Sequence, residues 1–369
     1  MNIVILGPYY PYRGGISDTN QELFENLINA GHNVQVINFK LQYPSLFFPG
    51  KMQYITNYNK TIKKSIRIIN TINPFNWLYV AKKINELAPD LLINSYWSPY
   101  FSPCFSLINR MLNKQIVKIG LIHNAFPHEK IIFQKEFLKF YINSIDKYVC
   151  FSETVKNQIH SLIPKKKGKT IYHPIHRKFG NPIEQKKARK KLNLKNNVRY
   201  ILFFGTIRAY KGLDILLKSM KFVFLKEKKV ELLIVGENYE SLNKYSKFLN
   251  NPDYKNKIHL FNNYIDDDEL KYWFSASDLV VQPYKRSSQS GITPLTFQFE
   301  VPTITTNVGG LSEQIKNNIN GFICEPNHQD LSNKITFALN FDKNLMLREI
   351  KKQKEKLNWI KFIKSLLNW

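Results

Sequence analysis

The stretch FFGTIRAYKGLDILLKSM, residues 203–220, contains the pattern that decides the fold. Its first residues end a strand-like apolar run at Gly205, and the apolar spacing after Gly212 predicts a helix. Two cations, Arg208 and Lys211, stand between this strand and this helix. A helix N-terminus is itself electropositive, so the local field disfavours cations there. We therefore expect Arg208 and Lys211 to bind an anionic group.

The same succession of strand and helix recurs along both halves of the chain. Apolar runs predict strands at 2–7, 33–39, 90–95, 115–123 and 146–152, and again at 199–205, 231–236, 257–261, 278–284 and 302–307. Strands separated by helices pair in parallel, with helices on both faces of the sheet. The sequence thus predicts an α/β fold of two doubly wound, Rossmann-like domains that face one another across a cleft. Ligands of such sheets bind outside the carboxyl ends of the strands.

A segment rich in Lys, Pro and Gly at residues 163–184 interrupts this alternation and indicates a domain boundary. We assign residues 1–175 to an N-terminal domain and residues 176–345 to a C-terminal domain. The tail from residue 344 to residue 369 is predicted to form one or two amphipathic helices with an aromatic stripe, and residues 346–369 are expected to pack back toward the N-terminal domain.

The composition limits the class of protein. A chain of 369 residues is too long for one ordinary core and suits two domains of roughly 180 residues. Hydrophobic residues make up 43% and aromatic residues 14%, which excludes a disordered or fibrous chain. The three cysteines have no CxxC spacing, which argues against a disulfide framework and fits a reducing compartment. Since no His/Asp/Glu cluster has metal spacing, we expect no bound metal.

The charge and the N-terminus bear on location and partners. The first residues lack the features of a signal peptide, and no apolar run approaches the ~20 residues of a membrane span, so we expect a cytoplasmic protein.

The net charge of +26 indicates either an anionic partner or many solvated lysines. No nucleic-acid module is recognisable, so nucleic acid is not expected. The segment KTIKKSIRIIN, residues 60–70, puts cations beside apolar residues and favours the anionic inner face of the cell membrane.

Two further turns join a strand to a helix through small residues. Gly14 and Gly15 precede the first predicted helix, and residues 287–310 begin with Ser and Gly and end with a second pair of glycines. Such turns expose backbone N–H groups that can receive an anion. The turn with Gly14 and Gly15 does not have the GxGxxG spacing, so a dinucleotide-binding fold of the dehydrogenase type loses support.

The stretches GTIRAYKG (205–212), SGITPLTF (290–297) and VPTITTNVGGLSEQIKNNINGFI (301–323) resemble the retaining family-4 glycosyltransferases of the GT-B fold. The resemblance covers nearly the whole chain and is strongest over 199–325. It implies a metal-independent enzyme without a cofactor, which moves a hexose-type sugar from a nucleotide-diphosphate-sugar to a hydroxyl of a glycan or lipid-linked glycan in surface polysaccharide biosynthesis. The N-terminal domain would lie on the acceptor side, and the C-terminal domain would bind the donor.

The resemblance also implies roles for particular residues. Arg208 and Lys211 would hold the donor diphosphate, and His123, at the end of a predicted strand, would orient the acceptor hydroxyl or the donor sugar as the third catalytic residue. The expected donor-binding residues are Gly14, Gly15, Gly205, Ser288, Gln289, Ser290, Gly291, Ile292 and Thr296. The expected acceptor-side residues are Asn124, His128 and Glu129.

The sequence departs from the family at two positions. Many members carry a Glu, seven residues and a second Glu across the turn and helix that here begin near Gly291, and these positions hold Ser288 and Thr296. Their loss and the high charge favour one alternative, a non-catalytic binder of nucleotide-sugars or polyanions. A second alternative on the same fold is a sugar-nucleotide epimerase, which would need acid–base carboxylates in the cleft.

Overall fold

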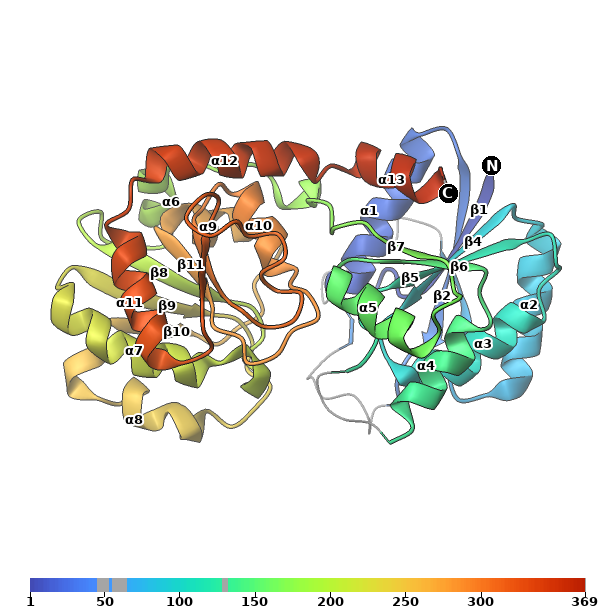
Figure 1. Ribbon diagram of the computed structural model, residues 1–369, viewed down its shortest axis with the longest axis horizontal. Coiled ribbons are helices and arrows are strands. Elements are labelled where there is room, and N and C mark those ends of the chain that lie inside the picture. The colour runs from blue at the N-terminus through green and yellow to red at the C-terminus, as the bar shows by residue number, and fades with distance from the viewer. Residues whose placement is uncertain (45–52, 55–64, 128–131, 369) are drawn as a thin grey trace. The chain divides into compact units, whose positions relative to one another are not determined.

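The computed structural model of the protein describes residues 1–44, 53–54, 65–127 and 132–368. The chain divides into two compact units, one formed by Met1–Tyr172 and Trp359–Trp369 and the other by His173–Asn358. We call them unit 1 and unit 2 and describe each by itself. Both have the doubly wound α/β architecture that the strand–helix alternation predicts, with helices on both faces of a parallel sheet (Figure 1).

The described part of unit 1 contains a seven-stranded parallel sheet in the order β3-β2-β1-β4-β5-β6-β7. Its strands are β1 (Asn2–Leu6), β2 (Asn33–Leu41), β3 (Ser65–Asn70), β4 (Leu91–Tyr96), β5 (Val117–Ile122), β6 (Lys147–Cys150) and β7 (Gly168–Thr170). Its helices are α1 (Gly15–Asn29), α2 (Pro74–Leu87), α3 (Ser102–Arg110), α4 (Gln134–Ile142), α5 (Glu153–Leu162) and α13 (Trp359–Leu367).

Alternation along β1 sends its side chains into two cores. Val4 and Leu6 pack into the core beneath α2, α3, α4 and α5, while Ile3 and Ile5 pack into the core beneath α1 and α13. Helix α13 thus completes the second face of a sheet whose strands come from the other end of the chain.

Unit 2 contains a six-stranded parallel sheet in the order β10-β9-β8-β11-β12-β13. Its strands are β8 (Arg199–Phe204), β9 (Val230–Val235), β10 (Ile258–Phe261), β11 (Leu279–Gln282), β12 (Thr303–Thr306) and β13 (Phe322–Cys324). Its α-helices are α6 (Gln185–Lys191), α7 (Leu213–Lys226), α8 (Ser246–Leu249), α9 (Leu270–Ala276), α10 (Ile292–Gln298), α11 (His328–Leu339) and α12 (Lys343–Lys356). The chain order reverses between β8 and β11, which is where such sheets bind their ligands.

Every strand predicted from the apolar runs is present, with bounds that differ by only a few residues. Three further strands, β3, β7 and β13, were not predicted. β7 and β13 are three residues long, and β7 is the polar sequence GKT at the edge of its sheet. Such short or polar edge strands carry little of the apolar pattern on which the prediction depends.

The structure places two segments that carried expectations. Residues 65–70 of the segment expected at the membrane form β3, an edge strand of the unit 1 sheet, in which Ile69 is buried and Ile66 and Ile68 are half-buried. Residues 60–64 lie outside the described part. The C-terminal tail, expected as one or two helices, forms two, of which α12 belongs to unit 2 and only α13 to unit 1. Trp359 and Phe362 of α13 are buried in unit 1, and Trp369 lies outside the described residues.

Candidate functional site

The loop after β8 brings three segments of unit 2 together. Gly205 ends the strand with φ +100°, a conformation that favours glycine. A Cβ atom at Gly205 would lie 2.9 Å from Nζ of Lys211 and 3.6 Å from Cδ1 of Ile292, the first residue of α10. The end of β8, the turn containing Lys211 and the start of α10 therefore meet at one point.

Lys211 is a buried cation. The residue is only 7% exposed, and its Nζ atom lies 5.7 Å from the centroid of the Tyr284 ring. Burial, followed by the nearby charge of Arg208, lowers the pKa of Lys211 from the usual 10.5 to about 7. Among the described residues, no carboxylate pairs with this ammonium group. An anion that reached it would therefore meet an uncompensated positive charge.

Arg208 is half-buried and immediately precedes the short 3-10 turn Ala209–Lys211. Its Cζ atom lies over the ring of Tyr239, 4.9 Å from the centroid. Within the described part of the chain, Arg208 also has no acidic partner. Arg208 and Lys211, which we call the cation pair, thus lie at the point of the unit 2 sheet where the strand order reverses.

The second glycine loop packs against the turn before α10. Gly309 has φ +50°, and a Cβ atom there would lie 1.9 Å from the carbonyl oxygen of Ser287. The N–H of Gly310 donates to the same oxygen at 3.2 Å. The two loops that follow β11 and β12 are therefore fixed to one another, and only glycine can stand at position 309 without moving them.

The turn before α10 is more enclosed than the sequence suggests. Ser288 is buried, Gln289 and Ser290 are half-buried, and Gly291 is exposed. The N–H of Ile292 already donates to Oγ of Ser290 at 3.1 Å, so this amide is not the bare donor that we expected for a phosphate.

Thr296 lies inside unit 2. It is completely buried, and its hydroxyl donates to the carbonyl oxygen of Thr293 at 2.7 Å. This placement differs from the expected contact with the donor, because a fully buried hydroxyl that caps a turn of its own helix presents no surface to a ligand.

The candidate residues of unit 1 follow two of its strands. Gly14 and Gly15 are exposed at the start of α1, with no atom within 4 Å of the place that a Cβ would take. His123 directly follows β5 and is 3% exposed. Its backbone N–H donates to the backbone carbonyl oxygen of Tyr96 at 2.8 Å, and its ring centroid lies 4.8 Å from that of Phe151.

The remaining acceptor-side candidates are only partly described. Asn124 is half-buried next to His123, whereas His128 and Glu129 lie outside the described residues.

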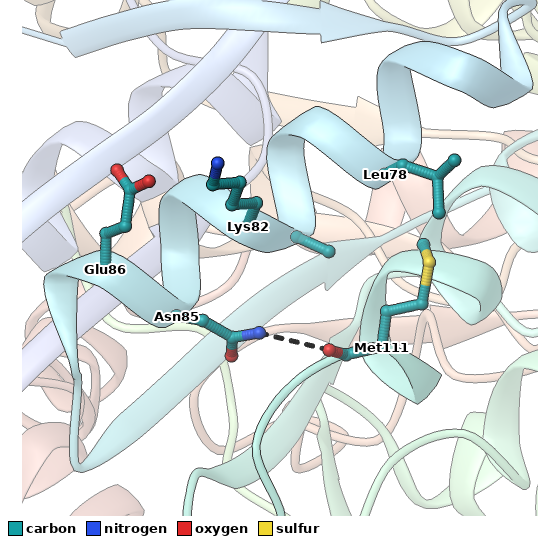
Figure 2. A pocket seen from close by; sticks show the side chains of 6 residues that line it. Leu78, Lys82, Asn85, Glu86 and Met111 are labelled. Atoms are coloured by element: carbon teal, nitrogen blue, oxygen red, sulfur yellow. Dashed lines mark hydrogen bonds between the residues drawn. The ribbon is translucent and has the colours of Figure 1, made fainter.

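A surface depression in unit 1 lies elsewhere. It is lined by Leu78, Ala81, Lys82, Asn85, Glu86 and Met111. Figure 2 shows the Asn85 side chain of α2 reaching the backbone of Met111, which follows α3; Nδ2 of Asn85 donates to that carbonyl oxygen at 3.1 Å. None of the candidate site residues lines this depression.

Metal-binding clusters and membrane-spanning helices are two features that the described residues lack. In the part of the chain that the structure describes, no group of three or more His, Cys, Asp or Glu side chains is placed to hold a metal ion. None of the described helices has the length and apolar character needed to cross a membrane.

Two family models match the chain. The model described as Glycosyltransferase Family 4 matches residues 13–179, and the model described as Glycosyl transferases group 1 matches residues 184–356. Together they leave only residues 1–12, 180–183 and 357–369 unmatched. The chain belongs to the family-4 glycosyltransferases.

Individual relatives agree with this assignment. An uncharacterized glycosyltransferase of Methanocaldococcus jannaschii is 24% identical over 357 residues, which cover 89% of this glycosyltransferase and 86% of the relative. Sucrose-phosphate synthase from Thermosynechococcus elongatus has a TM-score of 0.76 at 16% identity, with 99% of this chain and 97% of that chain covered. The HepE protein of Anabaena, solved in complex with UDP, also has a TM-score of 0.76, at 14% identity and with 100% and 99% covered. The fold of the glycosyltransferase is GT-B.

Two residues of this glycosyltransferase were missed by reasoning from sequence. Tyr239 follows β9 and Tyr284 follows β11, and each ring lies against one member of the cation pair. The available signal was their position: Tyr239 follows the strand predicted at 231–236 by three residues, and Tyr284 is the last residue of the strand predicted at 278–284. Both therefore lie near the carboxyl ends of strands, as Gly205 does. A cation–π contact between two loops joins residues far apart in the chain, so no spacing pattern in the sequence predicts it.

Proposed function

We propose that this glycosyltransferase moves a hexose-type sugar, with retention of anomeric configuration, from a nucleotide-diphosphate-sugar to a hydroxyl of a glycan or lipid-linked glycan acceptor. The observation that carries the proposal is the cation pair: two positive charges without acidic partners among the described residues, at the reversal point of a parallel sheet. HepE, which has a similar fold, has been solved with UDP and with UDP-glucose, and this supports a nucleotide-sugar donor.

In the proposed reaction the bond between the anomeric carbon and the diphosphate oxygen breaks, and its electron pair stays on the diphosphate. Arg208 and Lys211 stabilise this developing charge, in place of a metal ion. The acceptor oxygen forms the new bond to the anomeric carbon on the same face, and its proton passes to the leaving-group oxygen. His123 orients the acceptor hydroxyl or the donor sugar, with Gly14 and Gly15 near the phosphates.

The donor can be identified by thermal unfolding with UDP-, ADP- and GDP-sugars, because a ligand at a hundred times its dissociation constant stabilises a protein by about 2.7 kcal/mol. Product analysis with the stabilising donor then tests the reaction. A glycosylated acceptor with free nucleotide supports transfer. A changed sugar on the nucleotide supports an epimerase, and binding without turnover over a panel of glycan acceptors supports a non-catalytic binder, which the absence of both family glutamates at Ser288 and Thr296 favours.

We further propose that the enzyme works on the inner face of the cell membrane in surface polysaccharide biosynthesis. Helix α2 supports this location, because its first half is apolar on the solvent side as well as the core side. Phe75 is 82% exposed, Leu78 56% and Tyr79 54%, and the exposed Lys82 follows one turn later. Apolar side chains beside cations suit an anionic lipid surface.

Co-sedimentation with phosphatidylglycerol vesicles tests this location. The wild-type protein should bind at low salt and dissociate as salt is added. Replacing both Phe75 and Leu78 by Ser should reduce binding, whereas replacing Leu345, which is 62% exposed in unit 2, should not. Equal binding of both variants would exclude α2 as the contact surface.

A further inference from the structure

Most cations of unit 2 for which a partner is known are neutralised by carboxylates. Examples are Arg189 with Asp278 at 2.8 Å and Lys178 with Asp267 at 2.7 Å. The cation pair differs, since the groups that face Arg208 and Lys211 are aromatic rings. An ion pair fixes a cation but cancels its charge, so a ligand anion must compete with the carboxylate. A ring attracts the cation through its quadrupole and leaves the net charge intact.

Backbone hydrogen bonds hold the ring of Tyr239 beside Arg208. The N–H of Ile207 donates to Glu237 at 2.9 Å, and the N–H of Tyr239 donates back to Ile207 at 3.1 Å, so the loops after β8 and β9 form a short parallel bridge. The N–H of Asn238 donates to the Asn262 side chain at 2.9 Å, which ties the same loop to the end of β10.

The second ring is fixed more deeply. Tyr284 is 4% exposed, and its carbonyl oxygen accepts a hydrogen bond from Oγ1 of Thr306 at 2.6 Å. The backbone N–H of the next residue, Lys285, donates to the backbone carbonyl oxygen of Tyr210 at 2.7 Å, which joins the loop after β11 to the turn that carries Lys211. The two rings thus reach the cation pair from separate loops, one on each side of β8 in the sheet.

We infer that Tyr239 and Tyr284 are positioning residues, whose rings hold Arg208 and Lys211 ready for the diphosphate without neutralising them. This inference rests on the proposed function, because it assumes that the cation pair receives a diphosphate. A guanidinium group stacked on a ring keeps its N–H donors at its edge, where they can still bind two phosphate oxygens. Positioning of this kind would strengthen the binding of the phosphates and leave the binding of the base and the sugar unchanged.

Tyr239 offers the sharper test, because it is half-buried and can be changed without opening a large cavity. The variant Tyr239→Leu removes the ring, and Tyr239→Phe keeps the ring but loses the hydroxyl that donates to Glu237 at 3.3 Å. The matched control is Tyr272→Leu, since Tyr272 is also half-buried in unit 2 and its ring lies 5.2 Å from Nζ of Lys271, away from the cation pair.

Calorimetric titrations with inorganic pyrophosphate, UDP and uridine separate the possible roles. We expect Tyr239→Leu to lower the affinity for pyrophosphate and for UDP about fivefold or more and to leave the affinity for uridine unchanged. The variants Tyr239→Phe and Tyr272→Leu should bind all three ligands as the wild type does. Wild-type affinity for pyrophosphate and UDP in Tyr239→Leu would overturn the positioning role, and so would an equal loss for uridine. Failure of the wild-type protein to bind pyrophosphate or UDP would instead overturn the proposed diphosphate site, and this inference with it.

Discussion

A Cβ atom added to Gly205 would lie 2.9 Å from Nζ of Lys211, so the turn after β8 and the buried ammonium group share one tightly filled space. We predict that Gly205→Ala lowers the affinity for UDP at least tenfold. The added methyl group must displace the ammonium group at the end of the Lys211 side chain from the position at which we propose it meets the diphosphate. The φ of +100° adds backbone strain of about 1–3 kcal/mol.

Gly31→Ala is the matched control for this variant. Gly31 also has a positive φ, +85°, but no atom lies within 4 Å of its Cβ position, and it belongs to unit 1. This control should show a similar loss of stability in urea with unchanged UDP affinity. If both variants bound UDP as the wild type does, the contact between Gly205 and Lys211 would have no role in binding.

The second prediction concerns the cation pair itself. Arg208→Ala and Lys211→Ala should each lower the turnover of the donor at least tenfold, since one preorganised donor to a developing charge is typically worth roughly 3–4 kcal/mol of barrier. Circular dichroism should show an intact fold in both. The control is Lys195→Ala, which removes the same charge from unit 2 at an exposed lysine whose Nζ lies 3.5 Å from Glu231. Unchanged turnover in both site variants would remove the cation pair from the mechanism.

The cation pair also shows how far sequence reasoning reaches. The doubly wound units were predicted from apolar strands and helical spacing, because these patterns follow directly from which side chains must be buried. The place of Arg208 and Lys211 at the end of a strand was predicted from the same succession of strand and helix along the chain. The depth of Lys211, by contrast, depends on Tyr284, which follows β11, and on the close approach of Ile292 at the start of α10, both far along the chain. The hydrogen bond from the N–H of Ile292 to Oγ of Ser290 and the burial of Thr296 likewise depend on packing that no local pattern specifies.

The third prediction concerns protons. The pKa of Lys211 in the unliganded protein is about 7, and a bound diphosphate should raise it. The complex therefore binds more protons than the free protein, so affinity for the diphosphate should fall as the pH rises above about 7. UDP-glucose is the suitable probe, because its diphosphate does not titrate near neutrality. At pH 8, its binding enthalpy should vary with the ionisation enthalpy of the buffer.

Lys211→Arg provides the control for proton uptake, because arginine stays charged throughout this range. This variant should bind UDP-glucose with an affinity that is nearly independent of pH between 7 and 9. A wild-type enthalpy that is the same in all buffers at pH 8 would show that no group takes up a proton on binding, and the coupling to Lys211 would be refuted.

The last prediction follows from the cost of keeping Lys211 buried. Its pKa is about 7 in the folded protein and close to 10.5 when the chain is unfolded, so the unfolded state binds more protons between these values, and this lysine makes stability rise with pH there. Below pH 7 the full cost of the buried charge is present. Lys211→Met should therefore raise the free energy of unfolding in urea at pH 6.5, by about 2 kcal/mol or more, and the gain should shrink toward pH 10.

Lys195→Met, at a side chain that is 68% exposed, should give no such gain. A Lys211→Met variant less stable than the wild type at pH 6.5 would mean that the charged amine stabilises the fold. The lysine would then have a structural role, and its burial would be no sign of a ligand-binding role.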